Sequence, residues 1–171
     1  MLVVTMPLGG ISSGTQCILS FNYGACNMDR VTKAHRFITI LCAAYTAIMF
    51  VLARVCGSVF ISLFTTDEAL AIQAMRAIRI CTLSIIPLGV QYSIIDGLTG
   101  MGQVQLSLPL SFWRKGVYFA AIFLLARIWG ASSVLYAEPI SDILGPLVSI
   151  LVEAKYLKKV LEDRVNSLQA S

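Results

Sequence analysis

The sequence is poor in charge. Asp, Glu, Lys and Arg make up 13% of its 171 residues, whereas roughly 25% is typical of soluble globular domains. Hydrophobic residues account for 57%, and the mean hydropathy is +0.81. A soluble domain of this length could not bury so much apolar surface, but a lipid bilayer can accept it. The composition therefore predicts a polytopic membrane protein.

Residues that build catalytic and metal sites are also scarce. The sequence has one histidine and five cysteines, and no two cysteines form a C-x-x-C pair. It has no glycine loop to hold a phosphate and no nucleophile–base pair. We interpret the cysteines as small apolar residues within helices, and His35 as a charge at the membrane interface. The sequence predicts neither an enzyme nor a metal site.

The basic residues do not form a nucleic-acid-binding surface. The net charge is only +4, and Lys and Arg cluster beside the apolar segments, as in cytoplasmic loops of membrane proteins. We therefore expect a lipid bilayer, and no nucleic acid, as a partner. A secretory signal needs a basic n-region, but the first basic residue is Arg30. The apolar start leads us to expect further sequence upstream.

Five apolar segments are long enough to cross a bilayer, which needs about 20 residues per helix. They predict an all-α fold, a bundle of about five transmembrane helices within residues 1–157. Pro87 should kink the third segment by freeing the carbonyl of Leu83. The segments are approximately 2–21, 37–64, 69–99, 106–128 and 132–152.

The segments outside the apolar runs predict an orientation. The loop 22–36 and the tail 158–171 are rich in basic residues, and the positive-inside rule places both in the cytoplasm. The tail also has apolar residues at helical spacing, which predicts an amphipathic continuation at the membrane surface. We therefore expect a multi-pass protein of the cell membrane with a cytoplasmic C-terminus.

Polar residues within apolar segments are costly in a bilayer and are candidates for a site. Tyr92 and Asp96 share one helical face, and Gln91 is adjacent; this stripe could line a cavity and bind a cation. Alternatively, Asp96 lies near the cytoplasmic end and is solvated. Gln16 and Asn22, in and just after the first segment, are further candidates for a cavity.

The acidic pair Glu138 and Asp142 has i, i+4 spacing and so shares a helical face. It could relay protons or sodium, or it could be neutralised at the outer mouth by Arg127 or Arg54. Two further pairs of residues are candidates for a cavity wall or for helix packing. Arg114 and its neighbour Lys115 either reach the inner interface or form the basic wall of a cavity. Gly10 and Gly14 form a G-x-x-x-G pattern that favours close helix packing.

Several of these residues belong to motifs that resemble the multidrug and toxic compound extrusion family. The resemblance extends over about residues 8–160. Its first part, through the end of the first segment, is similar to a Q-P-I-I-S-Y-N-Y-G-A motif. The later parts resemble the tenth helix and the last two helices of the family. The motifs are Gly14-Thr15-Gln16, Ser20 to Ala25, Ala77 to Ile80, Pro87 to Tyr92, Arg114, and Ala137 to Asp142.

The resemblance implies that the chain corresponds to most of one six-helix lobe, the C-terminal lobe of a two-lobed transporter. Such proteins export cationic amphipathic small molecules by alternating access, coupled to inward flow of protons or sodium. The partner would then be an N-terminal lobe missing from this chain, without which we expect no transport. The motif departs at Cys17, where proline is usual, and at Asp96, where many relatives have a small residue. Alternatives are a lipid-linked oligosaccharide flippase of the same superfamily and a non-transporting membrane remnant.

Overall fold

The computed structural model describes residues 2–169, except for the side chains of 131–132 and 163–169. All its regular elements are helical, and no strand occurs among the described residues, which confirms the predicted all-α fold. The elements are α1 (Leu2–Gly24), α2 (Met28–Val55), α3 (Gly57–Ser62), α4 (Glu68–Cys81), α5 (Ile85–Gly100), α6 (Val104–Trp129), the 3-10 helix η1 (Ala131–Tyr136) and α7 (Ala137–Gln169).

Four helical segments are long and apolar enough to cross a membrane by themselves: α1, α2, α6 and the η1–α7 segment. A fifth span forms if α4 and α5 are taken together, as a pair bent by 48° at a short break. The chain is therefore a multi-pass membrane protein with up to five spans.

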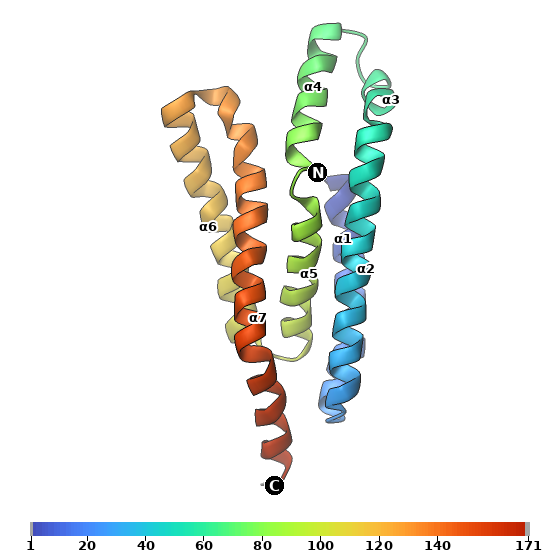
Figure 1. Cartoon of the computed structure of the whole chain (residues 1–171), viewed down its shortest axis with the longest axis vertical. Helices are drawn as coiled ribbons and strands as arrows, with labels where there is room; N and C mark the ends of the chain where they lie inside the picture. Colours follow the sequence, from blue (N-terminus) through green and yellow to red (C-terminus); the bar gives the residue numbers. More distant parts are fainter. Residues whose placement is uncertain (1, 170–171) are drawn as a thin grey trace.

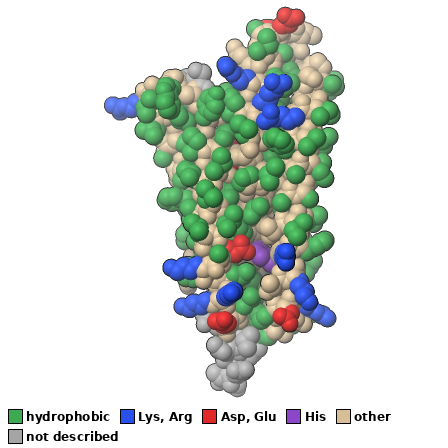
Figure 2. Space-filling model, in the orientation of Figure 1, with side chains coloured by type: hydrophobic (Ala, Val, Ile, Leu, Met, Phe, Trp, Pro, Cys, Tyr) green, Lys and Arg blue, Asp and Glu red, His purple; other side chains and the backbone are tan. Residues whose placement is uncertain are grey.

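α5 lies in the centre of the bundle, with α1 and α2 on one side and α6 and α7 on the other (Figure 1). α7 extends past the other helices at the end where the chain terminates. Apolar side chains cover much of the visible outer surface (Figure 2), and Phe21 and Phe123 are about three-quarters exposed. Such exposure suits contact with lipid rather than water.

Small residues on α5 allow α2 to approach closely. A Cβ atom added at Gly89 would lie 2.7 Å from Oγ1 of Thr46, and one added at Gly97 would lie 2.8 Å from the ring of His35. Between them, the Ser93 hydroxyl donates to Oγ1 of Thr39 at 3.0 Å. Small residues are common at such crossings because they let backbones come together in lipid.

No described helix of this chain packs closely on the glycine pair of α1. A Cβ atom added at Gly10 or Gly14 would meet no atom within 4 Å. The predicted close packing of this pair stays a prediction, because G-x-x-x-G spacing identifies a shared face but not the direction in which that face points.

The break in the third span confirms the effect predicted for proline. α4 ends at Cys81 and α5 begins at Ile85, so the interruption includes Leu83, whose carbonyl Pro87 leaves without a helical partner. Pro87 itself lies in the first turn of α5, where a missing N–H has no cost. The bend therefore precedes the proline by one turn.

Helix α2 starts earlier than predicted. Asn27 caps it by accepting a hydrogen bond from the backbone N–H of Arg30, so most of the expected loop 22–36 is helical. At its other end α2 stops at Val55, and the separate α3 completes the predicted segment. The first three turns of α2 therefore carry the basic residues that were expected in a loop.

The C-terminal extension is helical, as its apolar spacing predicted, and it is continuous with α7. α7 continues unbroken through Gln169, and the last two residues of the predicted tail lie outside the described part. Val160 is buried, and its carbonyl accepts a hydrogen bond from the Tyr23 hydroxyl of α1 at 3.4 Å. Up to this point the extension packs against the end of the bundle.

Candidate functional site

An ion pair joins α6 and α7 inside the bundle. Nη1 of Arg114 lies 3.0 Å from Oδ1 of Asp142, and the side chains are only 19% and 2% exposed. Arg114 is fifteen residues before the end of α6 at Trp129, which is about 22 Å along the helix. The pair is therefore buried between the two helices, well inside α6 and in the second turn of α7. Arg114 forms part of a buried polar site instead of reaching the inner interface.

Two residues of α5 complete the surroundings of this arginine. The Arg114 guanidinium carbon lies 5.9 Å from the ring centre of Tyr92, a distance at which an aromatic ring attracts a cation. Nε2 of Gln91 donates to the Ser149 hydroxyl of α7 at 3.2 Å, but its Oε1 is buried without a hydrogen-bond partner. α5, α6 and α7 thus share one polar cluster, with one acceptor unused.

Gly145 provides the space for this cluster. A Cβ atom there would lie 2.8 Å from Oε1 of Gln91 and 3.0 Å from Cγ of Arg114. Pro146 follows, and its ring leaves the carbonyl oxygen of Asp142 without the usual helical donor. The backbone of α7 is therefore open to close approach at the level of the ion pair.

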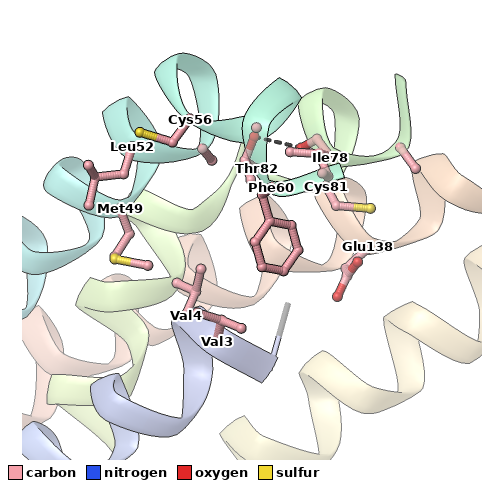
Figure 3. A pocket seen from close by; sticks show the side chains of 13 residues that line it. Val3, Val4, Met49, Leu52, Cys56, Phe60, Ile78, Cys81, Thr82 and Glu138 are labelled. Carbon is pink, nitrogen blue, oxygen red and sulfur yellow. Dashed lines mark hydrogen bonds between the residues drawn. The ribbon is translucent and has the colours of Figure 1, made fainter. Parts of the chain in front are cut away.

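Glu138 lies one turn before Asp142 and borders two cavities. One is a polar pocket of about 160 Å³, which it lines with Arg114, Lys115 and Asp142. The other is an apolar cavity of about 440 Å³ between α1, α2, α3 and α4. In Figure 3 the Glu138 carboxylate lies on the side of this cavity opposite Met49. The expected neutralisation by Arg127 or Arg54 is wrong, because it is Arg114 that pairs with this acidic turn, through Asp142.

The MatE family model matches residues 1–124, from α1 through most of α6. The chain belongs to the MatE family. A relative among characterised proteins is the multidrug export protein MepA of Staphylococcus haemolyticus (strain JCSC1435), which is 17% identical over 160 residues. The match covers 94% of this chain but 35% of the relative, so the chain spans about a third of that protein. No solved structure matches.

Membership of the MatE family supports the sequence-based resemblance, and members of this family are transporters rather than enzymes. The match ends before α7. The family match therefore includes Gln91, Tyr92 and Arg114. It does not include Asp142, the ion-pair partner of Arg114.

Other predicted residues of this MatE protein lie apart from the ion pair. The Asn22 side chain donates to the Ile18 carbonyl of its own helix at 2.7 Å. Gln16 is partly buried, and its backbone lies against Gly100. Asp96 is partly buried on α5, and neither of the two ion pairs found in the described residues includes it.

His35 is a buried residue that the sequence-based interpretation placed wrongly. Its side chain is 7% exposed, its ring packs against Gly97, and its Nε2 contacts a carboxylate oxygen of Glu153 on α7. A signal was present, because polar and small residues recur on one face of α2 at i, i+4, i+7 and i+11. These residues are His35, Thr39, Cys42 and Thr46.

The described residues include no group of three or more His, Cys, Asp or Glu side chains that could hold a metal ion. The five cysteines are all free.

Proposed function

We propose that this chain forms part of a multidrug and cation efflux transporter of the MatE family. In this proposal it exports cationic amphipathic small molecules in exchange for protons or sodium ions that flow inward. The observation that carries the proposal is the Arg114–Asp142 ion pair, buried between two apolar helices. Ionisable residues buried within membrane helices are costly and commonly serve an ion or substrate pathway. The family match and the name of the staphylococcal multidrug export protein support the same conclusion.

The ion pair suggests how a coupling ion could act. Asp142 is almost wholly buried, so it needs a positive partner, which is either Arg114 or a bound proton or sodium ion. Binding of the ion would release the guanidinium towards Tyr92 and the polar pocket. The unused Oε1 of Gln91 provides an acceptor beside the pair. Release of the ion would restore the original contact, so the site has two arrangements that the ion selects.

The proposal includes a partner, because the chain spans about a third of its relative. We propose that an N-terminal lobe packs against these helices and that the chain alone does not transport. We also propose that the protein lies in the cell membrane with its C-terminus in the cytoplasm. Six exposed basic residues near the end where α7 projects favour that orientation. They are Arg30, Lys33, Arg36, Lys155, Lys158 and Lys159.

A lipid-linked oligosaccharide flippase is less consistent with the site. Such a protein needs a cationic cavity for the phosphates of its substrate. Here Asp142 neutralises Arg114, and Glu138 shares the small pocket with Lys115. The pocket therefore carries as many acidic as basic side chains.

Transport can be tested in proteoliposomes with ethidium as a fluorescent cation and an imposed proton or sodium gradient. The chain reconstituted with an N-terminal MatE lobe should move ethidium in the direction opposite to the downhill flow of the coupling ion. Asp142→Asn should abolish this coupling. Arg127→Gln, on an exposed arginine of α6 that belongs to neither described ion pair, is the matched control. Ion-driven movement by the chain alone would contradict the two-lobe proposal. Absence of such movement with the lobe present would contradict efflux.

A further inference from the structure

A groove of about 600 Å³ lies between α4 and the segment before it, at the end of the bundle opposite to the C-terminus (Figure 1). One wall is a single face of α4, since its lining residues recur at helical spacing from Glu68 to Ile80. The other wall is formed by α3, the loop after it and Tyr136 of η1. Ile72 on the α4 wall is 71% exposed, and Phe64 in the loop is 76% exposed. The groove therefore opens on a surface that suits lipid rather than water.

The charged side chains of the groove are arranged in a fixed order along α4. Asp67 and Glu68 are at the start of the helix, and Arg76 and Arg79 follow in its second half. Arg76 comes eight residues after Glu68, which is about 12 Å along the helix axis. Neither ion pair among the described residues includes any of these four side chains. The groove thus has an acidic outer end and a basic inner part, each without a fixed counter-charge.

The two acidic residues are not equivalent. Oδ1 of Asp67 caps α4 by accepting from the backbone N–H groups of Ala69 and Leu70, at 2.9 and 3.4 Å. Glu68 is exposed and has no such role. The side chains of a helix also lean toward its N-terminus, so the guanidinium groups of the arginines extend toward Glu68. A ligand with an anionic and a cationic group could therefore contact both.

The order of charges matches the headgroup of a zwitterionic phospholipid. In such a headgroup the phosphate is next to the glycerol and the ammonium lies farther toward water. Figure 2 shows the same order on the protein at this end, with acidic side chains at the tip, basic ones below them and apolar ones around both. Guanidinium groups bind phosphate oxygens through paired hydrogen bonds, and a carboxylate accepts hydrogen bonds from an ammonium.

We propose that this groove binds a phospholipid whose headgroup carries a primary ammonium, with Arg76 and Arg79 on the phosphate and Glu68 on the ammonium. A quaternary ammonium fits less well, because it has no N–H to donate and is recognised by several aromatic rings together. Tyr136 is the one aromatic side chain among the described lining residues. An anionic headgroup lacks the positive charge that the acidic end requires. This binding does not depend on the proposed transport function.

The contact between ammonium and carboxylate can be tested by cross-linking. In vesicles that contain the full chain and phosphatidylethanolamine, a water-soluble carbodiimide joins the lipid amine to an adjacent carboxylate through an amide bond. Mass spectrometry of the peptides should find the lipid on Glu68. Asp29, an exposed carboxylate in the first turn of α2 at the other end of the bundle, is the control and should carry much less. Equal yields at the two carboxylates would overturn the proposal.

A double variant tests the phosphate contact. Arg76→Gln combined with Arg79→Gln retains the carboxylates but removes both guanidinium groups. Exposed ionic contacts are weak, so the yield at Glu68 should decrease about fivefold rather than vanish. Arg127→Gln, on an exposed arginine outside the groove, should leave this yield unchanged.

Unchanged helical circular dichroism and an unchanged yield at Asp29 would show that the double variant folds. A yield at Glu68 that survives the double substitution would overturn the proposal.

The choice of headgroup can be measured by native mass spectrometry of the full chain. Micelles would contain phosphatidylethanolamine, phosphatidylglycerol and phosphatidylcholine with the same acyl chains. The chain should retain phosphatidylethanolamine best, and Glu68→Gln should remove its advantage over phosphatidylglycerol. Equal retention of all three lipids by the unmodified chain would overturn the proposal and identify a groove for acyl chains alone.

A soluble competitor distinguishes a lipid from a free anion. Inorganic phosphate has no acyl chains to contact the apolar surface around the groove, so it should not reduce the cross-link at Glu68. Loss of the cross-link with inorganic phosphate would overturn the proposal and identify a site for free phosphate.

Discussion

Substitution of either partner of the Arg114–Asp142 pair should destabilise the bundle strongly. Removing one partner of a buried ion pair typically costs about 3–5 kcal/mol, because the other charge stays buried without compensation. The two costs should differ. Arg114→Gln leaves a carboxylate that is 2% exposed, whereas Asp142→Asn leaves a guanidinium that is 19% exposed. We therefore expect about 5 kcal/mol for the first and about 3 kcal/mol for the second.

The double variant distinguishes the ion pair from general packing. With both charges removed, neither residue leaves an uncompensated charge, so the cost should be well below the sum of the single costs. The coupling should reach about 2–3 kcal/mol, within the range found for residues in contact. The free energy of unfolding can be measured in mixed micelles by titration with sodium dodecyl sulfate. Arg127→Gln, on an exposed arginine of α6 outside the ion pair, is the control, and we expect a change within about 0.5 kcal/mol.

The reasoning would be refuted by a coupling no larger than that of an ordinary interhelical hydrogen bond in a membrane, which averages about 0.6 kcal/mol. Equal single costs with no coupling would likewise show that the two side chains act independently.

Two further predictions concern the contact of α2 with α5 and α7. Gly97→Ala should destabilise the bundle by about 1–3 kcal/mol in thermal unfolding, because overpacking forces the His35 ring to move. Gly10→Ala, in open space, is the control and should not destabilise the bundle. Equal effects of the two substitutions would contradict the packing of Gly97 against His35. His35→Ala should cost about 1.5–3 kcal/mol, the usual value of a hydrogen bond to a charged group, and Glu153→Gln should cost less because an amide oxygen can still accept from Nε2. A larger effect of Glu153→Gln would contradict this contact.

The sequence was sufficient to predict the spans and the break at the third one. Length and hydropathy determine whether a segment crosses a bilayer, and Pro87 removes a helical hydrogen bond in any context. Helix ends were less predictable, as the early start of α2 shows. Asn27 is a suitable cap for that helix, but the charged residues that follow it are also typical of a loop, and a loop was predicted there.

For the site, the sequence indicated Gln91, Tyr92, Glu138 and Asp142 because polar residues in apolar helices are costly wherever they point. It did not indicate the partner of Asp142. Arg114 is 28 residues away along the chain, and helical periodicity describes only neighbours on the same helix.

The sequence by itself determined that this chain lies in a membrane, crosses it through apolar helices and carries charge within them. These properties follow from residue type and local spacing. Only the tertiary structure decided which charges meet. The crossing of α6 with α7 placed Arg114 against Asp142, and the packing of α2 on α5 buried His35. Contacts between helices depend on the direction in which each face points, which is fixed only when all the helices pack together.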